Sequence, residues 1–193
     1  HKKKLLNKDK KLLRFITGAL LLGELENQPT MSPCKDMLSS GDQVAKRIKD
    51  SGARYVQISL DGARPETHDG FRGVPGVFEK TIRGMKNCVE QEIFVEVSTT
   101  GTTYSKDEIL EIIELCEQIN VPWWILYNFV PSGRGSFIAE NDLTPEEREE
   151  ILRQLYQRLK SNSKVEVLST APQFARVSLQ MGKEDKDKAE KIW

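Results

Sequence analysis

The segment YVQISLDG places polar residues directly after alternating apolar ones, close to residue 60. The hydroxyl of Ser59 and the carboxylate of Asp61 can both exchange hydrogen bonds with a ligand. The polar segment that follows contains His68, Asp69 and Arg72. Ser, Asp and Gly are also ordinary turn residues, so this segment on its own predicts a turn as readily as a binding site.

Two later apolar segments end in the same way. IFVEVSTT (93–100) ends in Thr99 and Thr100, and PWWILYNFV (122–130) contains Asn128 and leads into the glycine-containing loop PSGRGS. Because the carboxyl ends of parallel strands meet at one edge of a sheet, polar residues at those ends gather in one place. Three successive segments of this kind favour a shared ligand site over three unrelated turns.

The elements that would position these residues alternate between strands and helices. Runs rich in β-branched and aromatic residues predict strands at 54–60, 93–100, 122–130 and 164–169. Apolar residues at helical spacing predict helices at 40–52, 77–91, 105–120 and 144–160. The last two helices begin with the capping-box patterns Ser105 to Glu108 and Thr144 to Glu147, and the charged face of the last one is expected to be solvated.

Serial strand–helix units of this length predict an α/β fold with a parallel sheet. Right-handed crossovers leave two arrangements open, a doubly wound sheet or an arc of a (β/α) barrel. An α/β domain is expected at 38–182, preceded by an amphipathic helix and irregular linker at 1–37 and followed by a charged segment at 183–193. The absence of an initial Met and the abrupt charged end predict a chain cut at both ends.

Composition excludes several classes of function. The 193 residues contain 29 Lys plus Arg and 29 Asp plus Glu, so the net charge gives no support for nucleic-acid binding. Three widely spaced cysteines, Cys34, Cys88 and Cys116, and only two histidines predict neither a zinc site nor disulfides. Reduced thiols indicate a cytoplasmic protein. The apolar run FITGALLL near the N-terminus is too short to cross a bilayer, so no membrane segment is expected.

Taken in order, these motifs resemble a known family. The segments SLDG, HDGFR and VPSGRG, at the spacing of βα units, are similar to the middle and later strands of radical S-adenosylmethionine (radical SAM) enzymes. The likeness extends over roughly residues 38–180 and points to the subgroup with C-terminal accessory cluster domains. Within that subgroup it points to the haem-biosynthesis type that decarboxylates porphyrin propionates, which implies a partial barrel of radical SAM type.

The resemblance also implies roles for particular residues. The SxDG segment would lie beside the ribose of S-adenosylmethionine, with Ser59 and Asp61 hydrogen-bonded to its hydroxyls and Gly62 in the turn. Thr99 and Thr100 would extend this polar wall, and the backbone near Val130 would meet the adenine. The implied cofactor-binding set is Ser59, Asp61, Gly62, Thr99, Thr100, Asn128, Val130 and Pro131.

The family does not settle the roles of His68, Asp69 and Arg72. Arg72 either contacts the ligand or holds its own loop in place by pairing with Asp69 or a neighbouring carboxylate.

The sequence departs from the family in its cysteines. Radical SAM enzymes hold a four-iron four-sulfur cluster through a CxxxCxxC motif, which this sequence lacks, as it also lacks a Gly-Gly-Glu-Pro segment. We therefore expect an incomplete radical SAM protein that is inactive as given, with catalytic residues unassigned. The parent enzyme would take a small-molecule or peptide substrate and an electron donor.

One alternative from another class remains. A cluster-free α/β module could bind a nucleotide or phosphorylated metabolite at the same edge, with the PSGRGS backbone and Arg134 contacting the phosphate. An ordinary glycine loop at PSGRGS would explain that segment equally well.

Overall fold

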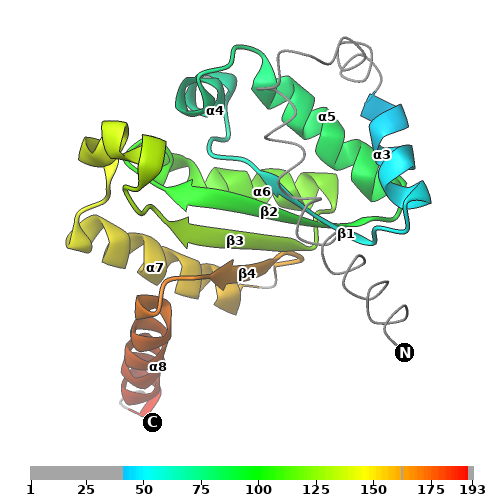
Figure 1. Cartoon of the computed structure of the whole chain (residues 1–193). Helices are drawn as coiled ribbons and strands as arrows, with labels where there is room; N and C mark the ends of the chain where they lie inside the picture. The colour runs from blue at the N-terminus through cyan, green and yellow to red at the C-terminus, as the bar shows by residue number, and fades with distance from the viewer. Residues whose placement is uncertain (1–40, 162, 191–193) are drawn as a thin grey trace, which may run out of the picture.

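A computed structural model describes residues 41–161 and 163–190 of the chain (Figure 1). The predicted N-terminal helix and linker at 1–37, and Cys34 with them, lie outside the described residues. Among the described helices, none is long and apolar enough to cross a membrane.

In the part of the chain that the structure describes, four parallel strands form a sheet, and their order in space is their order in the sequence. They are β1 (Tyr55–Ser59), β2 (Phe94–Gly101), β3 (Trp123–Asn128) and β4 (Glu166–Ser169). Each strand pairs in parallel with the next. Strand, helix and strand repeat along the chain, and the helices α5, α6 and α7 lie along one face of the sheet (Figure 1). The predicted parallel α/β fold is confirmed.

Among the described residues, four helices occur where the sequence predicts them, and three helical segments were not predicted. The predicted ones are α3 (Gly41–Asp50), α5 (Val77–Glu90), α6 (Ile109–Ile119) and α7 (Pro145–Lys160). The others are α4 (Pro65–Arg72), α8 (Gln173–Glu190) and the 3-10 segment η2 (Gly133–Asn141). A further 3-10 segment, η1 (Lys106–Glu108), lies within the helix predicted at 105–120. The helix α4 forms because Pro65 occupies its first turn and Gly73 ends it in the left-handed conformation, at φ +67°.

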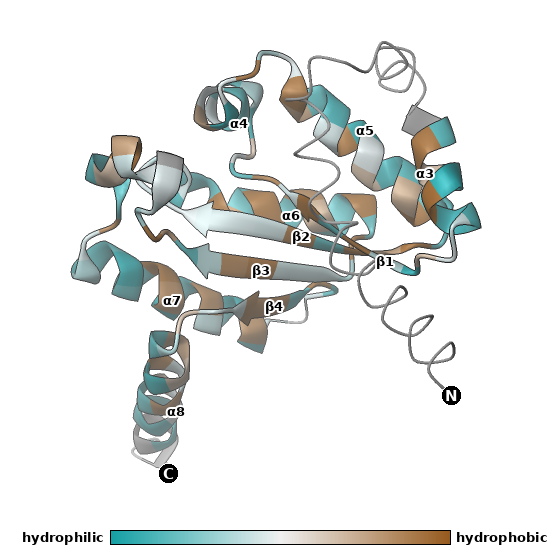
Figure 2. Ribbon diagram, viewed as in Figure 1, coloured by the Kyte–Doolittle hydropathy of each residue, from teal (hydrophilic) through white to brown (hydrophobic). Residues whose placement is uncertain are grey.

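The core lies between the sheet and the helices. Alternate strand residues, including Val56, Val95, Val97, Trp124 and Leu126, are at most 3 % exposed and pack toward the helices. Figure 2 shows how β2 changes from apolar near its start to a paler, polar arrowhead, which is the end that carries Ser-Thr-Thr. Burial of the apolar alternation fixes which face each strand residue occupies.

One predicted capping box is confirmed and the other is wrong. The Thr144 hydroxyl accepts the Glu147 amide and the Glu147 carboxylate accepts the Thr144 amide at the start of α7. Ser105 makes no such contact, because its hydroxyl donates to the Thr100 carbonyl at 2.7 Å. Glu108 is instead used to hold α4, as described below.

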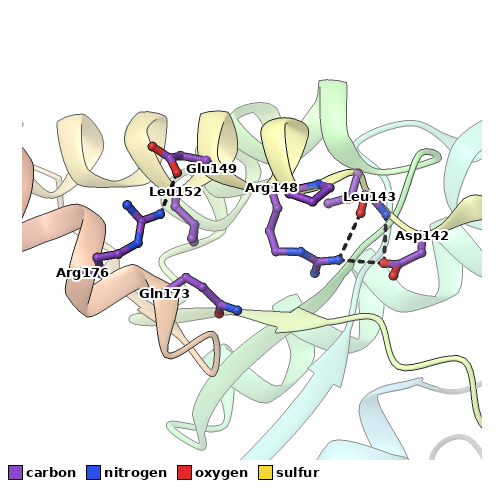
Figure 3. Close-up of a pocket in the computed structure, with 8 residues that line it drawn as sticks. Asp142, Leu143, Arg148, Glu149, Leu152, Gln173 and Arg176 are labelled. Atoms are coloured by element: carbon purple, nitrogen blue, oxygen red, sulfur yellow. Dashed lines mark hydrogen bonds and ion pairs between the residues drawn. The ribbon is translucent and has the colours of Figure 1, made fainter.

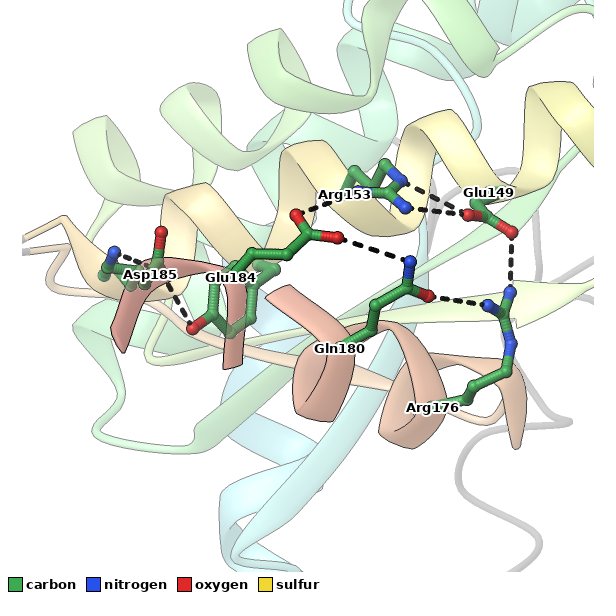
Figure 4. A network of polar contacts seen from close by, with 8 residues as sticks. Glu149, Arg153, Arg176, Gln180, Glu184 and Asp185 are labelled. Atoms are coloured by element: carbon green, nitrogen blue, oxygen red, sulfur yellow. Dashed lines mark hydrogen bonds and ion pairs between the residues drawn. The ribbon is translucent and has the colours of Figure 1, made fainter. Parts of the chain in front are cut away.

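The helix α8 packs against α7 and covers part of the face that was expected to be solvated. Val177 is fully buried in this contact, and Arg176 donates to Glu149 of α7 at 2.6 Å (Figure 4). Farther along, Lys160 of α7 pairs with Asp185 at 2.6 Å. The expected boundary between 182 and 183 lies within α8, which spans Gln173–Glu190.

Candidate functional site

The carboxyl ends of β1, β2 and β3 form one edge of the sheet, here called the carboxyl edge. On the sheet face opposite the helices, here called the inner face, Ser59 stands beside Ser98 because the two are partners in the β1–β2 register. Their hydroxyl oxygens are 3.2 Å apart. Thr100, two residues beyond Ser98, lies on the same face. This row of hydroxyls, with Ser59 exposed, is a hydrogen-bonding surface at the carboxyl edge.

Two of the predicted residues face the other way. Thr99 is fully buried on the helix side, where its hydroxyl donates to the Leu60 carbonyl at 2.7 Å and accepts from Trp124 Nε1 at 2.9 Å. Asn128 also turns toward the helices, and its Oδ1 accepts from Arg148 at 2.9 Å. The prediction that Ser59, Asp61, Thr99 and Asn128 or Val130 converge on one ligand therefore fails for the side chain of Thr99, because strand residues of opposite parity occupy opposite faces.

Asp61 lies at the carboxyl edge but is closed to solvent. Its side chain is 1 % exposed, and one carboxylate oxygen accepts the Thr100 amide at 2.8 Å. The other oxygen pairs with Arg72. Both oxygens therefore have protein partners, and direct contact of Asp61 with a ribose stays a prediction. Of the two readings left open for Arg72, pairing with a neighbouring carboxylate is the one the structure shows.

His68 is buried beneath the same turn. Its Nδ1 accepts the Asp61 amide at 3.0 Å, so the neutral ring carries its proton on Nε2, which lies 3.4 Å from the Thr81 hydroxyl. Burial lowers the pKa of His68, an effect that the charge of Asp61 partly opposes. The ring is therefore a neutral support for the backbone of Asp61.

Asp69 acts on the next helix. Its carboxylate accepts the amides of Gly76 and Phe78 at 2.5 and 2.7 Å, at the start of α5. Burial alone would raise the pKa of Asp69, but these backbone hydrogen bonds outweigh it and lower the pKa. Because the N-cap position of α5 is Gly76, which has no side chain, Asp69 supplies the missing cap from α4.

The start of α4 is fixed by Gly62 and Glu108. A Cβ at Gly62 would lie 2.6 Å from Thr67 Cβ and 2.7 Å from the backbone nitrogen of His68, so only glycine permits this close approach. The Glu108 carboxylate accepts the Ala63 amide at 2.6 Å and the Thr67 hydroxyl at 2.5 Å. Arg64 also donates to it, at 2.7 Å.

The remaining predicted residues lie in the loop after β3. Val130 is 69 % exposed and Pro131 is also exposed, so both are accessible from solvent. The side chain of Arg134 is outside the part of the structure that is described. Whether Gly62, Val130 and Pro131 contact a ligand stays a prediction.

A polar cluster on the inner face was missed by the sequence analysis. Gln57 donates to Glu96 at 2.5 Å and to the Tyr127 hydroxyl at 3.1 Å, and Glu96 is only 5 % exposed. Burial and a hydrogen bond with Glu96 raise the pKa of Tyr55. The signal in the sequence was a charged residue inside an otherwise apolar strand, which marks Glu96 as a residue needing a partner.

An open pocket of about 390 Å³ lies between the start of α7 and the start of α8 (Figure 3). Arg148 and Arg176 point into it, but each is paired, Arg148 with Asp142 at 2.8 Å and Arg176 with Glu149 at 2.6 Å. The opposite charges balance, so the pocket offers no net attraction to an anion.

The described cysteines do not fit an iron–sulfur cluster. Cys88 and Cys116 are 4 % and 0 % exposed in the packing of α5 and α6, and burial raises the pKa of their thiols to about 11 and about 12. Cluster ligation requires thiolates held close together. Within the described residues, no group of three His, Cys, Asp or Glu side chains could hold a metal ion.

Comparison with known proteins gives clear sequence relatives, although no protein-family model matches the chain. The chain is 32 % identical over 174 residues to an AdoMet-dependent heme synthase of Oleidesulfovibrio alaskensis, covering 90 % of this chain and 43 % of the relative. It is 34 % identical over 141 residues to the protein of the same name from Nitratidesulfovibrio vulgaris, covering 73 % and 38 %.

A third relative, the Fe-coproporphyrin III synthase of Methanosarcina barkeri, is 37 % identical over 116 residues, covering 60 % of this chain and 29 % of the relative. The chain therefore spans less than half the length of these curated relatives.

A solved structure of similar fold is native anSMEcpe with bound AdoMet and the Cp18Cys peptide. It matches with a TM-score of 0.52 at 16 % identity, covering 65 % of this chain and 37 % of that one. This likeness concerns the fold alone and agrees with the parallel strand order. The sequence relatives identify the chain as a member of the radical SAM superfamily.

Proposed function

We propose that this chain supplies the S-adenosylmethionine-binding part of a radical SAM enzyme that modifies a porphyrin in haem biosynthesis. The observation that carries the proposal is the row of hydroxyls on the inner face, where Ser59 is exposed and Ser98 lies 3.2 Å from it. Relatives named AdoMet-dependent heme synthase and Fe-coproporphyrin III synthase support the substrate class. Peptide maturases are also among the relatives, so a peptide substrate is the second candidate.

The geometry revises which residues would hold the nucleoside. Ser59 and Thr100 would hydrogen-bond the ribose from the inner face, and the exposed loop at Val130 and Pro131 would border the adenine. Asp61, Gly62, Thr99 and Asn128 would shape this edge from behind, because their contacts are with the protein.

The four-iron four-sulfur cluster that the family implies does not fit the described cysteines, so we derive no step through it. In the family, such a cluster supplies the electron that cleaves S-adenosylmethionine. We propose that the parent enzyme obtains it from an electron donor and works in the cytoplasm.

Binding of S-adenosylhomocysteine to the purified chain, measured by isothermal titration calorimetry, tests the proposal. Ser59→Ala should weaken binding by roughly fivefold, which corresponds to one hydrogen bond of about 1 kcal/mol. Ser161→Ala is the matched control, because Ser161 is an exposed serine at the far end of α7. Absence of binding by the unmodified chain, or equal binding by the Ser59→Ala variant, would contradict the proposed function.

A further inference from the structure

We propose that Arg72 acts through Asp61 to position the carboxyl edge for the nucleoside, and that the HDGFR segment supports this edge from behind. This inference rests on the proposed function for its ligand. It assigns a role to residues that neither the motif nor the relatives explain, and it begins from the burial of Asp61.

Asp61 depends on Arg72 as the partner of its buried carboxylate. A carboxylate that is 1 % exposed cannot be hydrated, and a buried charge without a partner is strongly unfavourable. The Arg72 side chain is 37 % exposed, so the arginine itself would be hydrated without the pair. The dependence therefore runs in one direction: removing Arg72 leaves Asp61 uncompensated, whereas neutralising Asp61 leaves Arg72 in contact with water.

Asp61 in turn fixes the distance between β1 and β2 beyond their last paired residues. The pairing ends at Ser59 and Ser98, and the Leu60 amide donates to the Ser98 carbonyl at 2.9 Å. Two residues farther along β2, the Thr100 amide donates to the Asp61 carboxylate at 2.8 Å. A side chain thus continues the hydrogen-bond ladder at the level where the inner-face hydroxyls stand.

Arg72 lies at the end of α4, and contacts along the length of α4 hold this helix in place. Glu108 holds the residues at the start of α4 through the Ala63 amide and the Thr67 hydroxyl. Near the end of α4, Asp69 is tied to the first amides of α5. His68 accepts the Asp61 amide from the middle of the same helix. Because α4 cannot shift without breaking these contacts, it holds the Arg72 guanidinium against Asp61.

A double-mutant cycle distinguishes positioning from direct contact. With S-adenosylhomocysteine as the probe, Arg72→Gln should weaken binding roughly tenfold, within the range for residues that share one hydrogen-bond network. Arg72→Lys keeps a positive partner and should retain most of the affinity. In an Asp61→Asn background, Arg72→Gln should cost no further affinity, because the arginine acts only through the carboxylate. An equal loss in both backgrounds would overturn the proposal.

A shortened ligand gives a second criterion. 5′-Methylthioadenosine lacks the amino-acid part of S-adenosylhomocysteine, so it has no carboxylate that could pair with an arginine. If Arg72 positions the nucleoside, Arg72→Gln should weaken the binding of both ligands by the same factor. A loss confined to S-adenosylhomocysteine would mean that Arg72 binds the ligand carboxylate itself, which contradicts the proposal.

Hydrogen exchange at the Thr100 amide tests the positioning without any ligand. Arg72→Gln should increase exchange at Thr100, while Arg176→Gln, which removes an ion pair between α7 and α8, should leave it unchanged. The doubly neutral variant, Asp61→Asn with Arg72→Gln, removes the uncompensated charge and serves if the single variant unfolds. If the unmodified chain binds no nucleoside, the proposed function is wrong. The link from Arg72 through Asp61 to β2 is refuted separately, by unchanged exchange at the Thr100 amide in the Arg72→Gln variant.

Discussion

At the scale of single residues, the polar groups after β1 bind one another more than they face solvent. Asp61, His68 and Arg72 form one connected set, and Asp69 caps a separate helix. Motif residues at a strand end are usually read as ligand contacts, but here only Ser59 combines a hydroxyl with an exposed position on the inner face. The motif therefore joins one candidate contact residue to a group of residues that position it.

His68 makes stability depend on pH. Because burial lowers its pKa in the folded protein, the unfolded state binds more protons below pH 6.5, and stability must fall as the pH drops through that value. Between pH 7.5 and 5.5 the loss should reach about 1.4 kcal/mol at most. His68→Gln keeps an acceptor for the Asp61 amide and cannot titrate. Urea unfolding should give this variant a lower free energy of unfolding that changes less with pH. An equal loss of unfolding free energy in both proteins as the pH falls would contradict the assignment.

At the scale of elements, the turn into α4 depends on one close approach. A Cβ added at Gly62 would meet Thr67 Cβ at 2.6 Å and backbone at 2.7 Å, so Gly62→Ala should destabilise the protein by about 1–3 kcal/mol. Gly70→Ala is the matched control within α4, because no atom lies within 4 Å of the added Cβ and alanine favours the helix by roughly 0.5–1 kcal/mol. The midpoint temperature of thermal unfolding should fall for Gly62→Ala and rise for Gly70→Ala.

The strands and the longer helices could be predicted because their apolar residues repeat with the correct period. The helix α4 was missed because its eight residues carry little apolar pattern, although Pro65 at its start and Gly73 just after its end are the usual boundary residues. The orientation of Thr99 was also available in principle, since it shares the parity of the buried Val97. The pairing of Arg72 with Asp61 could not be predicted, because it depends on where α4 docks.

At the scale of the whole molecule, the described cysteines belong to the core. Burial raises the pKa of Cys88 to about 11 and that of Cys116 to about 12, so neither forms appreciable thiolate at neutral pH. In a Cys34→Ser variant, a disulfide reagent at pH 8 should modify neither remaining thiol in the native protein and both after unfolding in urea. Rapid modification in the native state would show that one of the two helices packs differently.

The contact between Asp61 and Thr100 also bears on the order in which the molecule folds. It joins residues 39 positions apart, and the intervening chain must close around α4 and α5 before the contact can form. Closing such a loop costs entropy before the contact repays it, so non-local pairings of this kind slow folding. We expect the carboxyl edge to order late. Asp61→Asn should then raise the unfolding rate and leave the folding rate nearly unchanged in stopped-flow measurements.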